Sequence, residues 1–222
     1  EGYLFVQSAT CRHVKAAGDD TAGGLQMPHS ATINTEEFDL VLGSRRLAIL
    51  DLSPAGHMPM TKDDGRCWIV FNGEVYNYRE LRQQLKELGH SFRSDSDTEV
   101  ILAAYTEWGV DCLARFNGMF AFALWDSERN LLFCARDRFG VKPFYYCQQQ
   151  GFFAFASELK SLIQHPAVGR TPNHLAIYDY LALGVSDHTD QTFFAGIMSL
   201  PPGHYALLDL ADGSVRQQRW WE

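Results

Sequence analysis

The stretch GMFAFALWDSERNLLFCARD, Gly118 to Asp137, carries the clearest fold signal in this 222-residue chain. Apolar side chains alternate with others on both sides of a polar turn at residues 126–130. A period of two is typical of strands with one face on a core. We therefore predict an antiparallel hairpin. The side chains expected between its sheet and the covering helices are Phe120, Phe122, Leu124, Leu131 and Phe133.

Strand and helix patterns alternate on either side of this hairpin. Residues 40–52 predict a strand, a tight bend at Gly43-Ser44 and a second strand, and residues 68–71 predict a short apolar strand. Helices are predicted over 78–88, ended by Gly89, and from Ser96, where Ser96 to Glu99 fit a capping box. Later segments predict strands at 144–146, 152–155 and 203–210, with helices at 157–163 and 173–183. Helices between mostly antiparallel hairpins indicate a layered α+β fold.

Composition excludes several classes of function. The chain is 46% hydrophobic and 21% charged, as in ordinary globular proteins, and its net charge of −8 argues against nucleic acid or an anionic membrane as partner. No apolar stretch has the length of a membrane span. The five cysteines show no CxxC or metal-ligand spacing, which predicts reduced thiols, no metal site and a cytoplasmic location. Homodimerisation is left open.

The two ends of the chain differ from its middle. Residues 1–39 are rich in glycine and polar side chains, show little periodicity, and are interpreted as a divergent N-terminal segment. The chain begins at Glu1 without a methionine and ends at Glu222 in mid-phrase. We expect it to be part of a longer protein.

Polar residues at strand ends and one helix start are the candidates for chemistry. Arg46 lies in an apolar strand region, Asn72-Gly73-Glu74 follows the strand at 68–71, and Asp97 lies in the first turn of a helix. Arginine can clamp a carboxylate, aspartate can receive an ammonium group, and Asn and Gly N–H groups can stabilise an oxyanion. Each signal also has a purely structural interpretation, as a turn, a helix-dipole residue or a core ion pair.

From about Leu40 to its end the chain resembles the glutaminase half of asparagine synthetase, a class II glutamine amidotransferase. The resemblance rests on the phrases RRLAILDLSPAGHMPM, FNGEVYNYRELR, SDSDTEVILAAY, FNGMFAFALWD, ARDRFGVKPFYY, FASELKSL and LPPGHYALL, which occur in the family's order. It implies a four-layer αββα N-terminal-nucleophile hydrolase sandwich with two mostly antiparallel sheets, formed by residues 40–222. Arg136, Asp137, Arg138 and Lys142 are interpreted as structural ion pairs.

The resemblance also implies roles for individual residues. Arg46, with the backbone of Leu47, Ala48, Ile49 and Leu50, would hold the glutamine carboxylate. Asn72 and Gly73 would form the oxyanion hole, Glu74 would line the pocket, and Asp97 would bind the ammonium group. This domain would need no cofactor. ATP and magnesium would belong to an ATP-dependent synthetase domain expected beyond residue 222, the partner that would receive the ammonia.

One expected element is not found. The family's nucleophile is an N-terminal cysteine in Cys-Gly-Ile, followed by a His-Arg-Gly-Pro-Asp phrase, whereas this chain begins Glu1-Gly2-Tyr3. Three explanations stay open: a mistranslated first segment, a catalytically inactive pseudo-glutaminase scaffold, or a Cys11 freed by removal of a propeptide. As written, the chain is expected to lack covalent glutaminase chemistry.

Overall fold

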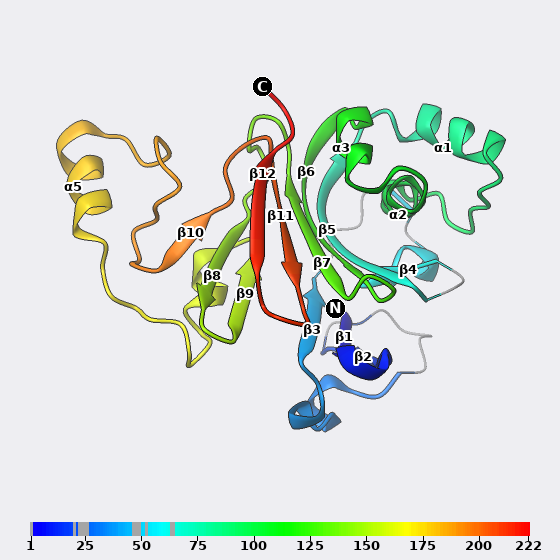
Figure 1. Cartoon of the computed structure of the whole chain (residues 1–222), viewed down its shortest axis with the longest axis horizontal. Helices are drawn as coiled ribbons and strands as arrows, with labels where there is room; N and C mark the ends of the chain where they lie inside the picture. The colour runs from blue at the N-terminus through cyan, green and yellow to red at the C-terminus, as the bar shows by residue number, and fades with distance from the viewer. Residues whose placement is uncertain (1, 20, 22–26, 46–49, 52, 63–64) are drawn as a thin grey trace.

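A six-stranded antiparallel sheet forms the centre of the computed structural model (Figure 1), which describes residues 2–19, 21, 27–45, 50–51, 53–62 and 65–222. The strand order is β12-β11-β7-β6-β5-β4. The bounds are β4 (Met60–Thr61), β5 (Cys67–Val75), β6 (Gly118–Asp126), β7 (Leu131–Arg136), β11 (His204–Asp209) and β12 (Val215–Arg219).

Two three-stranded antiparallel sheets together form a second layer on one face of the central sheet. The first has the order β2-β1-β3, with β1 (Gly2–Gln7), β2 (Arg12–Ala17) and β3 (Leu40–Ser44). The second has the order β10-β8-β9, with β8 (Tyr145–Gln149), β9 (Phe152–Ala156) and β10 (Ile197–Ser199).

Helices cover both outer faces. Helices α1 (Tyr78–Glu87), α2 (Asp97–Trp108) and α3 (Cys112–Arg115) pack on the free face of the central sheet, at the right of Figure 1. On the opposite side α4 (Leu159–Leu162) packs against β9 and β8, and α5 (His174–Leu183) lies at the left edge. The predicted α+β sandwich with antiparallel sheets is confirmed. No helix in the described part of the chain is long and apolar enough to cross a membrane.

The two faces of the central sheet bury different sets of side chains. One face places Phe122, Leu124 and Phe133 against α2, and the other packs against Leu4, Leu42 and Phe144 of the second layer. Phe120, Phe122, Leu124 and Phe133 are buried as predicted, and Leu131 is half-buried. This double-sided burial fixes the register of β5 and β6, on which the site is built.

Two predicted strand boundaries are wrong. Strand β5 does not stop before Asn72 but continues to Val75, because β6 pairs with it as far as Gly118. Strand β3 runs through Gly43-Ser44 without a bend, because β1 pairs with both residues. Of the second strand predicted in this region, residues 46–49 and 52 lie outside the described residues, and Leu50 and Asp51 are not in a strand.

The N-terminal segment is more regular than its composition predicts. Strand β1 is the middle strand of its sheet, with Leu4 and Val6 fully buried against the central sheet. The apolar run that produces this burial extends only from Tyr3 to Val6, too short to stand out among the surrounding polar residues.

Candidate active site

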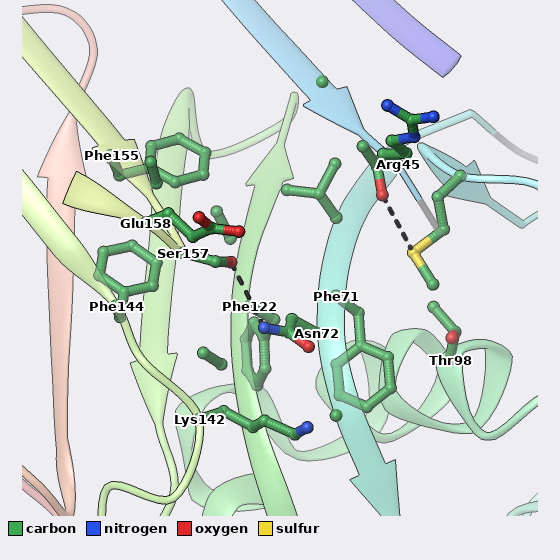
Figure 2. Close-up of a pocket in the computed structure, with 18 of the residues that line it drawn as sticks. Arg45, Phe71, Asn72, Thr98, Phe122, Lys142, Phe144, Phe155, Ser157 and Glu158 are labelled. Carbon is green, nitrogen blue, oxygen red and sulfur yellow. Dashed lines mark hydrogen bonds between the residues drawn. The ribbon is translucent and has the colours of Figure 1, made fainter. Parts of the chain in front are cut away.

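A cavity of about 700 Å³ opens between the two small sheets, over the central sheet (Figure 2). Strands β5 and β6 form its floor, the end of β3 and Tyr3 form one wall, and the end of β9 with the start of α4 forms another. Its volume is within the range of small-molecule sites. The cavity exists because the two small sheets pack on the same larger sheet without pairing to each other in the described part of the chain.

Asn72, Gly73 and Glu74 lie side by side on the floor of this cavity. Gly73 has φ +152°, and a Cβ on it would lie 2.1 Å from the backbone oxygen of Met119 on the neighbouring strand. Only glycine fits such a close approach of two backbones. The Asn-Gly pair therefore lies within strand β5, at a close approach to its partner β6, rather than in a turn.

The Asn72 side chain is directed towards the wall formed after β9. Its Nδ2 donates a hydrogen bond to Ser157 Oγ at 3.4 Å, the contact that Figure 2 marks between the two residues. The bond joins residues 85 positions apart in the chain. An amide nitrogen carries two protons, so the second remains available for an acceptor in the cavity.

Asp97 reaches the cavity from the start of α2. Ser96 caps this helix by accepting a hydrogen bond from the N–H of Thr98 at 3.1 Å. Asp97 is buried, and its carboxylate accepts a hydrogen bond from the backbone N–H of Val75 at 3.0 Å. Burial raises the pKa of Asp97, and the nearby charge of Glu74 raises it further, against the lowering effect of backbone N–H donors. The site thus holds a carboxylate that lacks a cationic partner among the described residues.

The predicted capping box forms only in part. Glu99 does not reach back to Ser96, because its carboxylate accepts hydrogen bonds from the backbone N–H groups of Arg93 and Ser94 and from Ser94 Oγ. These hydrogen bonds fix the turn that precedes α2. The position of Asp97 is therefore set both by this turn and by the hydrogen bond from Val75.

Most of the remaining wall consists of residues to which the sequence assigns no role in the site. Lys142, from the RDRFGVKPFYY phrase, and Ser157 and Glu158, from FASELKSL, line the cavity with Arg45 and Thr98 opposite (Figure 2). Both segments were recognisable in the sequence. The residue pattern of one strand or helix, however, does not indicate which distant strand that element will contact. The site therefore combines the carboxylates Glu74, Asp97 and Glu158 with the cations Arg45 and Lys142.

Five of the predicted site residues line this one cavity: Leu50, Asn72, Gly73, Glu74 and Asp97. They come from a loop, a strand and a helix, so their convergence is a property of the fold. Arg46, Leu47, Ala48 and Ile49 lie outside the described residues. The individual roles assigned to all nine stay predictions.

None of the cysteines lies among the described lining residues. Cys11 is exposed at the closed end of the β1–β2 hairpin, whereas Tyr3, at the other end of β1, lines the cavity. Strand geometry puts about 13 Å between Tyr3 and Gln7 alone. The other four cysteines are buried elsewhere. Among described residues no group of three His, Cys, Asp or Glu side chains is placed to hold a metal.

Arg136 and Asp137 bind backbone groups and form none of the predicted ion pairs with the described residues. The Arg136 guanidinium donates to the carbonyls of Lys142, Gly140 and Leu200 at 2.7–2.8 Å. The Asp137 carboxylate accepts backbone N–H bonds, including that of Phe120 at 3.1 Å. Both residues fix the turn that places Lys142 at the cavity.

Comparison with known families identifies the chain. The family sequence model of the glutamine amidotransferase domain matches residues 26–221. The chain belongs to the class II glutamine amidotransferase family. The match reaches back into the segment interpreted as divergent, and the predicted boundary near residue 39 stays a prediction.

Curated relatives of this glutamine amidotransferase domain include asparagine synthetases. The chain is 41% identical over 187 residues to asparagine synthetase (glutamine-hydrolyzing) 3 of Bacillus subtilis, covering 83% of this chain and 30% of the relative. It is 37% identical over 205 residues to a putative asparagine synthetase 2 of Methanocaldococcus jannaschii, covering 85% and 39%. Amidase chry2 of Gibberella zeae is 35% identical over 185 residues, covering 82% and 26%. The chain thus spans under two fifths of the length of each.

Solved structures agree with the amidotransferase fold. The glutamine phosphoribosylpyrophosphate amidotransferase of Bacillus subtilis superimposes with a TM-score of 0.63 at 16% identity, covering 99% of this chain and 42% of that one. An allosteric regulatory enzyme of purine biosynthesis gives a TM-score of 0.60 at 17% identity, with the same coverage. At such identity the likeness shows the N-terminal-nucleophile hydrolase-like fold alone.

Proposed function

We propose that this domain binds L-glutamine and forms the glutaminase half of an asparagine synthetase-like enzyme, which hydrolyses glutamine to glutamate and supplies ammonia for ATP-dependent asparagine synthesis. The observation that carries the proposal is the convergence of Asn72, Gly73 and Asp97 on one cavity. An oxyanion hole and an ammonium acceptor serve a common purpose only around one amino-acid ligand.

Asp97 would bind the α-ammonium group of glutamine. Its buried carboxylate already accepts one backbone N–H bond and has further acceptor capacity. Arg46 would hold the α-carboxylate, and Asn72 Nδ2 with the Gly73 N–H would face the side-chain carbonyl. A buried carboxylate without a cationic partner is costly, and a ligand ammonium group would offset that cost.

In the proposed reaction a thiolate attacks the glutamine side-chain carbonyl, and the negative oxygen that forms is held by the Asn72 and Gly73 donors. The carbon–nitrogen bond breaks, ammonia leaves with a proton from the general acid, and a thioester remains. Water then hydrolyses the thioester to glutamate and restores the thiol. By family resemblance the thiol belongs to an N-terminal cysteine whose α-amine acts as base.

No cysteine among the described lining residues can supply this thiol. The hydrolytic step therefore needs a cysteine from elsewhere in the parent protein. The same observation favours a second candidate, a catalytically inactive glutaminase scaffold that supports a synthetase domain. ATP and magnesium would act in that synthetase domain, and the cytoplasm is the compartment we propose for the parent enzyme.

Calorimetric titration of the folded chain with L-glutamine tests the binding proposal. We expect saturable binding by the wild-type chain and its loss in Asp97→Asn. Asp95→Asn is the matched control, because Asp95 is exposed, pairs with Arg82 at 3.2 Å and lies outside the cavity lining. No binding by a folded wild-type chain, or equal binding by Asp97→Asn, would overturn the proposed pocket.

Glutamate release and labelling by an electrophilic glutamine analogue separate the enzyme from the scaffold. The chain as written should bind glutamine yet release no glutamate and take no label. The parent protein should do both if it supplies the N-terminal cysteine. A label mapped to Cys11 would instead revive the propeptide explanation.

A further inference from the structure

We infer that the apolar surface of α5 is the docking surface for a folded domain that follows Glu222 in the parent polypeptide. The inference rests on the proposed two-domain organisation, but it uses no residue of the glutamine cavity. The name α5 surface is used below for Leu175, Tyr178, Tyr180, Leu181 and Leu183.

Helix α5 exposes apolar side chains that a folded domain usually buries. Leu175, Tyr178 and Leu181 follow one another at three-residue spacing and are 67%, 63% and 77% exposed. Tyr180 and Leu183 extend the apolar area around the helix, and no residue of α5 is buried. Single exposed leucines are common, but a cluster of this kind marks an interaction surface.

The helix is held in place by polar contacts at its ends. The Asn173 side chain caps it by accepting the N–H of Ala176 at 3.3 Å, and the Asn173 N–H donates to Phe193 O at 2.8 Å. His188 Nε2 lies 3.0 Å from an Asp179 carboxylate oxygen. A ten-residue helix is only marginally stable in water by itself, since most helix stability in proteins comes from packing an apolar face. Tyr180 packs edge-on against Phe193, with ring centroids 5.5 Å apart, and the rest of the α5 surface is a preformed face without a cover among the described residues.

The end of the chain points to what that cover is. Trp221 packs against Phe139 with ring centroids 5.1 Å apart, and Phe139 and Val141 are themselves 74% and 57% exposed. The same turn is linked through Arg136 to Ser199, whose N–H donates to Asp190 O in the connection that follows α5. In Figure 1 the C-terminus lies at the top of the central sheet, and α5 lies at the upper left, on the side of β8 and β10.

The size of the relatives agrees with this assignment. The chain covers 30%, 24% and 39% of three asparagine synthetases, so most of each relative lies outside the matched region. A body of that size, tethered at Trp221, would be held next to the α5 surface at high effective concentration. We therefore assign the surface to the following domain of the same polypeptide.

Electrostatic repulsion makes a second copy of this chain a poorer partner for the α5 surface than the following domain. Asp179, Asp187 and Asp190 lie in or near α5, and each copy carries a net charge of −8. Two α5 surfaces would bring these carboxylates together, which costs free energy. A complementary partner offers an apolar groove with a neutral or basic rim.

Hydrogen–deuterium exchange on the parent protein and on this chain tests the inference. We expect the α5 amides to exchange at least ~10-fold more slowly in the parent, because coverage suppresses local opening. Leu181→Asp in the parent should remove that protection. Leu88→Asp is the matched control, since Leu88 is 54% exposed at the end of α1, on the other side of the molecule.

Three outcomes would overturn the inference. Equal α5 exchange in the parent and in this chain would show that nothing covers the surface. A parent reading frame that ends near Glu222 would remove the proposed occupant. Sedimentation that shows a dimer of this chain, lost in Leu181→Asp, would assign the surface to self-association. Glutamine binding by this chain should be the same with and without Leu181→Asp, so a failure of the docking inference is distinct from a failure of the pocket.

Discussion

The carboxylate of Asp97 accepts a hydrogen bond at 3.0 Å from the backbone N–H of Val75, two residues after Gly73 on the same strand. This contact joins the first turn of α2 to the strand that carries the Asn72-Gly73 pair. It sets the position of the proposed ammonium acceptor relative to the proposed oxyanion hole with one short, buried bond. A change at Asp97 therefore affects the charge of the pocket and, less strongly, the position of its floor.

Asp97→Asn should separate binding from stability. The asparagine oxygen can still accept the Val75 N–H, while the cost of burying a charge disappears, so the free energy of unfolding at pH 7 should stay equal or rise by about 1 kcal/mol. Glutamine binding should weaken by roughly 2–5 kcal/mol, the scale for removing one partner of a buried charge pair. Urea unfolding and calorimetry measure the two effects. A large loss of stability would instead make Asp97 a structural residue.

Glutamine affinity should depend on the protonation of Asp97. Burial raises the pKa of its carboxyl above 3.8, and a protonated carboxyl cannot pair with the ligand ammonium group. Affinity should therefore fall as pH decreases through the raised pKa. The contribution of protonated Asp97 to the free energy of unfolding has the opposite pH dependence. It is complete below pH 3.8 and is lost as pH rises through the folded-state pKa. Affinity that stays flat across this acidic window would contradict the assigned role.

Gly73→Ala should damage the floor of the cavity. The added Cβ would meet the Met119 oxygen at 2.1 Å, and overpacking of this kind costs roughly 1–3 kcal/mol. Gly89→Ala is the control: its φ of +95° is also unfavourable for alanine, but its Cβ would meet no atom within 4 Å. Thermal unfolding of both variants isolates the steric part. Equal losses would mean that backbone conformation alone accounts for the effect.

Arg46→Ala should weaken glutamine binding by roughly 2–4 kcal/mol if Arg46 clamps the α-carboxylate, since a desolvated charge would lose its partner. Calorimetry on the wild type and the variant measures the difference. Arg115→Ala is a suitable control, because Arg115 packs over Trp108 at 4.1 Å, outside the cavity lining. Equal affinities in Arg46→Ala would give Arg46 a structural role.

The buried carboxylate of Asp126 should govern acid stability. Burial by itself raises its pKa, but the hydrogen bond and charge of Arg66 outweigh this and lower it below 3.8. The resulting stability is present above pH 3.8 and is lost as pH falls through the folded-state pKa. Arg66→Ala should cost roughly 1.5–3 kcal/mol at pH 7, the scale for hydrogen bonds to charged groups, and should move acid unfolding to higher pH. Arg129→Ala, which removes a contact of 3.8 Å made by a side chain that is 58% exposed, should change little.

Local pattern was enough to predict the elements that have a regular apolar period or a capped apolar run. The hairpin of β6 and β7 was predictable because Phe120, Phe122 and Phe133 alternate with the other face over a full strand length. Helix α2 was predictable because Ser96 caps it and an apolar run follows. In both cases the residues that carry the signal are neighbours in sequence.

The end of β5 was not predictable, because Asn72-Gly73 is also a common turn signal. Pairing with β6 extends the strand through this pair, and pairing is a tertiary effect that sequence propensity does not contain. The Asn72–Ser157 contact has the same origin. It depends on how the sheet of β8 and β9 packs on the central sheet, which neither residue's neighbours reveal.

The packing of Trp220 has a practical consequence for where this domain ends. The indole stacks on Phe120 at 6.1 Å between centroids, and Phe120 lies opposite Gly73 in the β5–β6 ladder. Its Nε1 also donates to the carbonyl of Arg136 at 3.2 Å. The folded unit therefore extends past the last strand, β12, which ends at Arg219. A chain shortened to Arg219 would keep every strand yet uncover the phenylalanine behind the cavity floor, so domain boundaries drawn from secondary structure alone would cut into the site.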